Sequence, residues 1–153
     1  MSRTDAAARV VAASPARVFQ ALSDPDELVA WLPPSGMRGR FERFDLRPGG
    51  GYVLELTYDD ASAARGKSSA GSDVVESRFV EIVPGTRMVQ AVEFVADDPA
   101  FAGTMTMTWE LTAVEGGTRV EVRADDVPPG ISAEDHAAGL ASSLDNLAAH
   151  VAT

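Results

Sequence analysis

Apolar residues recur at three- and four-residue spacing near the end of the chain, which is the pattern of one helical face. The stripe consists of Ala137, Leu140, Ala141, Leu144, Leu147, Ala148 and Val151. Ser132 precedes it and can accept hydrogen bonds from the free N–H groups of a first turn. Glu134 and Asp135 follow, where the helix dipole favours negative charge. The pattern therefore predicts a long helix over residues 132–151.

Much of the preceding chain alternates between apolar and polar residues, which is typical of half-buried β-strands. The clearest run, residues 103–114, has one apolar face made of Met105, Met107, Trp109 and Leu111. Residues 52–58 have a similar face made of Tyr52, Leu54, Leu56 and Tyr58. Further strands are predicted at residues 40–46, 74–83, 86–95 and 118–124. The short turns between the later strands predict antiparallel neighbours.

Two short helices are predicted after a first strand at residues 6–13. Ser14-Pro15 and Asp24-Pro25 each combine an N-cap residue with a proline at the first helical position. Glu27 lies three residues after the second N-cap, as in a capping box. The double proline at residues 33–34 ends the second helix.

The predicted order of elements is strand, two short helices, six strands and a long helix. We therefore expect an α+β fold, a single domain over residues 1–153 with a curved antiparallel sheet of six to seven strands. The long C-terminal helix is expected to pack on that sheet and cover its apolar face. The polar stretch at residues 59–72, rich in glycine, serine and alanine, is predicted to be a mobile loop.

This order of elements, with particular residues, resembles the START-like (SRPBCC) superfamily and its helix-grip fold. The nearest branch is the one named for activators of the ninety-kilodalton heat-shock ATPase. The resemblance covers residues 8–151 and rests on Ser14-Pro15 with residues 18–22, Trp31-Leu32-Pro33-Pro34, residues 45–50 (DLRPGG), residues 79–84 (FVEIVP), residues 128–131 (PPGI) and residues 139–148 (GLASSLDNLA). It implies a curved sheet that grips the C-terminal helix, with a cavity between them that often holds an apolar ligand. Members of the superfamily include lipid and hormone binders, cyclases, ring-hydroxylase subunits and a co-chaperone domain, so the resemblance implies no single activity.

Ten residues are the candidates to line such a cavity. They are Trp31, Tyr52, Leu54, Leu56, Tyr58, Met105, Met107, Trp109, Leu140 and Leu144. Methionine and aromatic side chains suit an adaptable apolar pocket, and tyrosine hydroxyls can orient a ligand. Much of the helical stripe is alanine, so the helix either lies very close to the sheet or leaves a cavity. The sequence leaves open whether the ten residues bind a ligand or fill a core.

Charge and composition exclude several partners. A formal net charge of −10 argues against nucleic acid and anionic membrane surfaces, which require clustered basic residues. Residues 1–5 are polar and carry no apolar signal segment, and the chain has no long apolar run. We therefore expect a cytoplasmic protein with no membrane span, whose partner is an apolar small molecule. The sequence leaves open whether the protein forms a homodimer.

Candidate catalytic, metal-binding and cofactor-binding residues are few. The chain has no cysteine, and His136 and His150 are too far apart to share a zinc site on one helix face. His136 is expected to be an exposed helix residue, and Glu55 and Glu110 are expected on the solvent face of their strands. The glycine-rich turn at residues 49–51 lacks nucleotide-binding spacing. We expect no catalytic residue, metal or cofactor.

The sequence leaves three functions open. The first is a binding module for an apolar or aromatic small molecule. The second is a co-chaperone-like interaction protein with a heat-shock ATPase as partner, which only the family name supports. The third is a cyclase- or hydrolase-type enzyme acting in the cavity, for which Tyr52, Tyr58 and Asp45 are the polar groups to consider.

Overall fold

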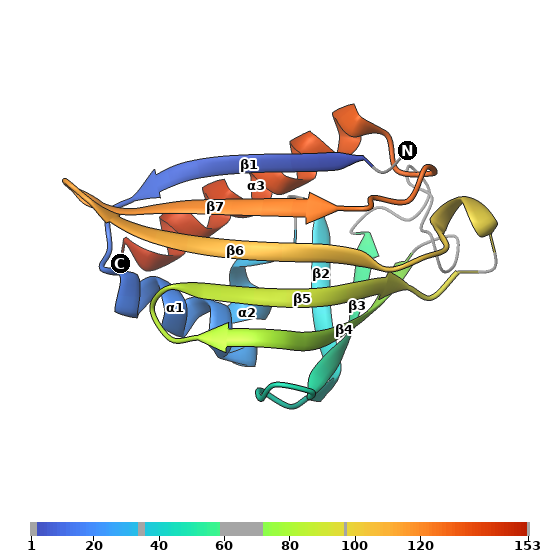
Figure 1. The fold of residues 1–153 in the computed structure, drawn as a ribbon, viewed down its shortest axis with the longest axis horizontal. Helices are drawn as coiled ribbons and strands as arrows, with labels where there is room; N and C mark the ends of the chain where they lie inside the picture. Colours follow the sequence, from blue (N-terminus) through green and yellow to red (C-terminus); the bar gives the residue numbers. More distant parts are fainter. Residues whose placement is uncertain (1–2, 34–35, 59–71, 97, 153) are drawn as a thin grey trace.

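Seven antiparallel strands form one curved sheet in the computed structural model, which describes residues 3–33, 36–58, 72–96 and 98–152 (Figure 1). The strands are β1 (Thr4–Val11), β2 (Met37–Phe44), β3 (Gly51–Tyr58), β4 (Ser72–Val83), β5 (Arg87–Phe94), β6 (Met105–Val114) and β7 (Gly117–Asp125). They lie in the order β1-β7-β6-β5-β4-β3-β2. The helices are α1 (Pro15–Ser23), α2 (Pro25–Trp31), the short 3-10 helix η1 (Pro99–Phe101) and α3 (Ala133–Val151). The predicted α+β fold and order of elements are confirmed.

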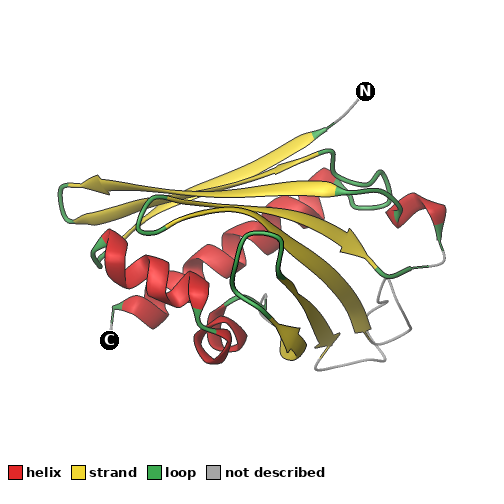
Figure 2. Ribbon diagram, turned by 60° about the horizontal axis from the view of Figure 1, so that its bottom comes forward, coloured by secondary structure: helices red, strands yellow, loops and turns green. Residues whose placement is uncertain are grey.

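The three α-helices lie on the same, concave side of the sheet (Figure 2). Each begins at the predicted N-cap. The hydroxyl of Ser14 accepts a hydrogen bond from the Arg17 amide at 3.2 Å, and that of Ser132 accepts one from the Asp135 amide at 3.0 Å. Asp24 caps α2 by accepting from the Asp26 amide at 2.8 Å. These bonds satisfy amides that a helix start leaves without partners.

A bulge in β2 interrupts the alternation of its buried face. The register with β3 shifts between Phe41 and Arg43, so one residue of β2 has no partner opposite it. Phe41 and Phe44 consequently point to the same side, although they are three positions apart. Both rings contact Tyr52, with ring centroids 5.0 and 5.8 Å apart respectively.

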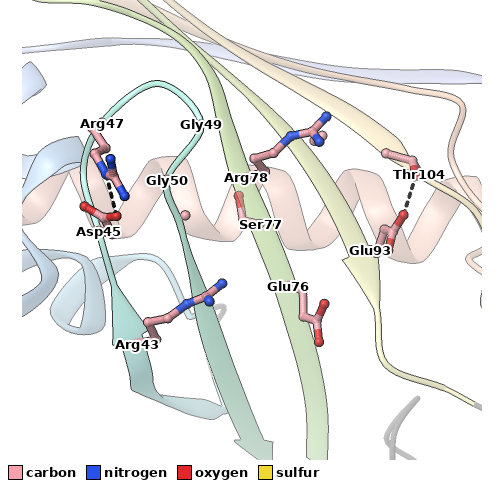
Figure 3. Close-up of a pocket in the computed structure, with 12 residues that line it drawn as sticks. Arg43, Asp45, Arg47, Gly49, Gly50, Glu76, Ser77, Arg78, Glu93 and Thr104 are labelled. Atoms are coloured by element: carbon pink, nitrogen blue, oxygen red, sulfur yellow. Dashed lines mark hydrogen bonds and ion pairs between the residues drawn. The ribbon is translucent and has the colours of Figure 1, made fainter.

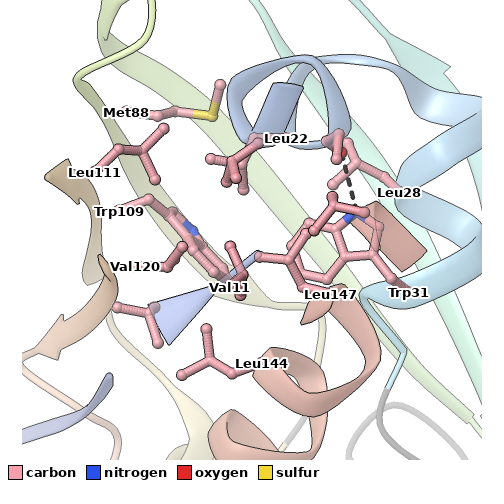
Figure 4. Close-up of a cluster of buried hydrophobic side chains, with 14 of the residues drawn as sticks. Val11, Leu22, Leu28, Trp31, Met88, Trp109, Leu111, Val120, Leu144 and Leu147 are labelled. Atoms are coloured by element: carbon pink, nitrogen blue, oxygen red, sulfur yellow. Dashed lines mark hydrogen bonds between the residues drawn. The ribbon is translucent and has the colours of Figure 1, made fainter. Parts of the chain in front are cut away.

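The C-terminal half of α3 packs in a solid core (Figure 4). Buried side chains on α3 are Leu140, Ser143, Leu144, Leu147 and Val151. Ala137 and Ala141, predicted in the apolar stripe, are exposed. The buried arc of the helix is therefore rotated towards Ser143, whose hydroxyl donates to the Leu32 carbonyl at 2.7 Å.

Residues 59–71 of the predicted loop lie outside the described residues. Ser72 does not belong to that loop, because it begins β4.

Candidate ligand-binding cavity

A cavity of about 530 Å³ lies between the concave face of the sheet and the N-terminal half of α3. The position follows from how α3 is held. Its C-terminal half is tied to α2 and the residues after it by Ser143, by Asn146, which donates to the Pro33 carbonyl at 3.1 Å, and by His150. The helix also runs beside β1, the edge strand of the sheet, with His136 of its first turn against Asp5. Space therefore remains over the central strands, which the side chains of β3 to β6 only partly fill.

Nine of the ten predicted residues line this cavity. They are Trp31, Tyr52, Leu54, Leu56, Tyr58, Met105, Met107, Trp109 and Leu140. Leu144 is not among the lining residues; it is 2% exposed and belongs to the packed core. It lies one helical turn after Leu140, where α3 already contacts the layer of α1 and α2.

Sequence patterns did not identify further lining residues, which lie on or next to α1, α2, β2, β4, β5, η1 and α3. The apolar ones are Leu22, Leu28, Leu32, Met37, Val75, Met88, Val92, Phe94, Phe101 and Ile131. The polar ones are Asp73, Gln90, Ser132, Asp135, His136 and Ser143. In residues 86–95 both strand faces carry valine, so alternation did not identify the inner face. Met88 and Val92 on either side of Gln90 were the available signal.

A buried polar cluster joins Tyr52 and Gln90, which line the cavity, to Ser77, which does not. The side-chain amide nitrogen of Gln90 donates to the Tyr52 hydroxyl at 3.1 Å and to the Ser77 hydroxyl at 3.0 Å. All three residues are buried. Burial raises the pKa of Tyr52, although the hydrogen bonds from Gln90 and Ser77 partly oppose this by favouring the phenolate. Tyr52 is therefore a neutral phenol at physiological pH, and it is poorly suited to act as a base.

The rim of the cavity is acidic. Burial raises the pKa of Tyr58, and the negative charges of Asp73 and Asp135 raise it further. The Tyr58 hydroxyl has no hydrogen bond to another residue in the described part of the chain. The rim therefore offers a neutral hydroxyl beside carboxylates.

His136 is not the exposed residue that the sequence predicts. Its side chain is 13% exposed, and its Nδ1 lies 2.8 Å from a carboxylate oxygen of Asp5. The physical reason is the contact between the first turn of α3 and β1, which brings Asp5 over the imidazole. Burial alone would raise the pKa of Asp5, but hydrogen bonds from His136 and Arg3 outweigh it and lower that pKa. Among the described residues, no group of three histidine, aspartate or glutamate side chains is arranged to hold a metal ion.

A second hollow, of about 480 Å³, lies on the outer face of the sheet (Figure 3). Its arginines are Arg43, Arg47 and Arg78, and its carboxylates are Asp45, Glu76 and Glu93. Asp45 accepts a hydrogen bond from Arg47 at 2.7 Å. Asp45 therefore lies away from the cavity, and it is not a polar group for chemistry inside it. Equal numbers of exposed opposite charges give this hollow no preference for a ligand charge, so the cavity is the stronger candidate site.

No helix within the described ranges combines the length and the apolar character needed to cross a membrane.

Residues 12–152 match the protein family described as "Activator of Hsp90 ATPase homolog 1-like protein". The crystal structure of protein CV1439 from Chromobacterium violaceum is similar, with 32% sequence identity, a TM-score of 0.86 and coverage of 98% of this chain and 97% of that chain. A Rhizobium loti protein is 26% identical, with a TM-score of 0.75 and coverage of 98% and 97%. A Rhodobacter sphaeroides protein at 22% identity and a TM-score of 0.77, covering 97% and 92%, shares the fold. No protein of curated function matches the chain in sequence. The chain therefore belongs to the family of Activator of Hsp90 ATPase homolog 1-like proteins, as its resemblance to the helix-grip superfamily indicated.

Proposed function

We propose that the protein binds a small apolar or aromatic molecule in the cavity between the sheet and α3. The observation that carries the proposal is the cavity itself, with a volume of about 530 Å³ and a wall rich in aromatic and methionine side chains. Ligand pockets in proteins typically have volumes of about 300–1,000 Å³ and mostly apolar walls with a few polar groups. This cavity has both properties.

Packing physics supports an occupant. The cavity is partly open to solvent, so water enters it when no ligand is bound. Water inside an apolar cavity finds few hydrogen-bond partners, because it needs two to four polar groups to be held well. An apolar ligand would replace poorly held water and restore contacts to the methionine and aromatic walls.

Native mass spectrometry of freshly purified protein, followed by solvent extraction of any bound species, tests the proposal. We expect an extractable apolar compound, or, for emptied protein, a shift in tryptophan fluorescence when an aromatic probe is added. The fluorescence readout is direct because the chain has two tryptophans, Trp31 and Trp109, and both line the cavity.

A matched pair of variants on β6 locates the binding. Met107→Trp places a larger side chain in the cavity, whereas Thr106→Val changes the outer face of the same strand. We expect Met107→Trp to weaken probe binding at least about tenfold and to leave the melting temperature unchanged or higher, since the new ring fills open space. Thr106→Val should bind as the wild type does. Equal binding by both variants would contradict the proposal.

A further inference from the structure

Three neighbouring strands each contribute one residue to a buried polar cluster, and two of these residues, Tyr52 and Gln90, line the cavity. Tyr52 of β3 is the register partner of Ser77 of β4, and Gln90 of β5 lies diagonally across from Ser77. The residues before and after Gln90 on the same face, Met88 and Val92, are apolar. So is its partner on β6, Met107. Apart from Tyr52 and Ser77, the neighbours of the Gln90 amide on this face are therefore apolar.

The Gln90 amide forms hydrogen bonds through its nitrogen but not through its oxygen. Its nitrogen has two hydrogens, and these are donated to the hydroxyls of Tyr52 and Ser77. Its oxygen, Oε1, accepts no hydrogen bond from any residue in the described ranges. Among the described residues, Nε of Arg3 is the one side-chain nitrogen or oxygen that is both fully enclosed and without a hydrogen-bond partner. Oε1 of Gln90 also has no partner, so it cannot be fully enclosed. Since Gln90 is only 5% exposed and lines the cavity, the open space that Oε1 touches is the cavity.

We infer that Gln90 is a specificity-determining residue, whose Oε1 selects apolar ligands that carry a hydrogen-bond donor, an O–H or N–H group. The inference rests on the proposed function and names the ligand class for the same cavity. A ligand that displaces water from Oε1 without supplying a donor leaves a buried acceptor unpaired, which costs free energy, whereas a ligand donor avoids that cost. A ligand with only an acceptor at that position would meet the oxygen with a like partial charge. The neutral phenol of Tyr52 holds the amide in this orientation by accepting from its nitrogen.

The test uses two probes of equal size, 2-naphthol, which carries an O–H donor, and 2-methylnaphthalene, which carries none. Isothermal titration compares the two affinities in the wild type and in Gln90→Met, which has a similar shape without the amide. We expect Gln90→Met to lower the affinity for 2-naphthol about tenfold, the value of one hydrogen bond, and to change that for 2-methylnaphthalene less than twofold. The ratio of the two affinities must therefore fall about tenfold.

A measurement on the unmodified protein avoids dependence on how the variant folds. The side-chain amide signals of Gln90 in a ¹⁵N–¹H spectrum should move when 2-naphthol binds and stay in place with 2-methylnaphthalene. Tyr52→Phe frees one amide hydrogen, so this variant should gain affinity for 2-acetylnaphthalene, which carries only an acceptor.

The outcomes separate the two claims. If neither naphthalene binds, the proposed function fails together with the inference. If both bind but the affinity ratio is the same in the wild type and Gln90→Met, the cavity binds ligands and the inference is overturned. Wild-type Gln90 amide signals that respond equally to both probes, or a wild-type preference for 2-acetylnaphthalene over 2-naphthol, would overturn it as well.

Discussion

The indole ring of Trp31 stands edge-on to that of Trp109, with ring centroids 5.6 Å apart and ring planes at 84°. Trp31 ends α2, and Trp109 lies in the middle of β6, so the pair joins the helical layer to the sheet. Both residues belong to the packed core and also line the cavity. Figure 4 shows the two rings among the core side chains, with the Trp31 nitrogen bonded to a backbone carbonyl. The pair therefore marks the boundary between solid core and open cavity.

Trp31→Phe tests how much the contacts of this residue stabilise the fold. The Trp31 indole N–H donates to the Ala21 carbonyl at 2.9 Å, and this carbonyl lies in the last turn of α1, where helical carbonyls lack helical partners. Phenylalanine would remove the donor and part of the ring contact. We expect the free energy of unfolding in urea to fall by about 2–3 kcal/mol. Leu46→Ala, at a residue that is 39% exposed, should change it by less than about 0.5 kcal/mol. Equal losses in the two variants would contradict this role.

Two glycine substitutions are expected to change the free energy of unfolding in opposite directions. A Cβ atom at Gly139, inside α3, would meet no atom within 4 Å, so Gly139→Ala should raise the free energy of unfolding by about 0.5–1 kcal/mol through helix propensity. A Cβ at Gly51 would overlap the Ser77 carbonyl oxygen, so Gly51→Ala should lower it by about 3 kcal/mol or more. Thermal melts of both variants check the signs. A stabilised Gly51→Ala would show that β3 and β4 do not approach each other so closely at this point.

The carboxylate of Glu27 joins all three α-helices. Arg17 of α1 donates to it at 2.6 Å, and His150 of α3 lies 2.8 Å from the same oxygen. Glu27 consequently does not complete the capping box that the sequence predicts, and Asp24 caps α2 alone. Burial alone would raise the pKa of Glu27, but the hydrogen bonds from His150 and Arg17 outweigh it and lower that pKa below its usual value of 4.5.

The lowered pKa of Glu27 predicts a pH dependence of stability. A carboxyl group with a lowered pKa in the folded state stabilises the fold above its unfolded pKa, and this contribution is lost as the pH falls through the folded pKa. We expect Glu27→Gln to reduce the free energy of unfolding by about 1–2 kcal/mol at about pH 6. The difference from wild type should shrink as the pH falls below 4.5. Asp145→Asn removes the exposed ion pair with Arg9 and should cost much less. A Glu27→Gln difference that does not depend on pH would contradict the assignment.

The fold could be predicted from the sequence because its signals are local. Ser14 and Ser132 are placed at helix starts by hydrogen bonds to amides only a few residues later. Alternation identified the inner faces of β3 and β6 because each carries most of its large apolar residues on one side. It failed in β2, where a bulge places Phe41 and Phe44 on the same side. A bulge depends on the neighbouring strand, so periodicity within one strand cannot reveal it.

The candidate site could be predicted only in its apolar part. Residues such as Leu54 and Met107 lie on the apolar faces of their strands. These faces must point to the interior whatever the exact position of the helix. Leu144 could not be separated from Leu140, because the point at which α3 leaves the cavity depends on its tertiary contacts with α2. Gln90 and His136 were missed for a related reason. Their burial depends on partners far away in the chain, Tyr52 and Asp5 respectively.

Nuclear magnetic resonance of protein carrying ¹³C-methyl methionine tests the central claim most directly. Four of the five methionines, Met37, Met88, Met105 and Met107, line the cavity, and single substitutions to leucine assign their signals. An aromatic probe such as 2-naphthol should shift these four methyl signals in a saturable way and with one common dissociation constant. A probe that binds the protein while these four signals stay in place would show that the space beneath α3 is not the binding site.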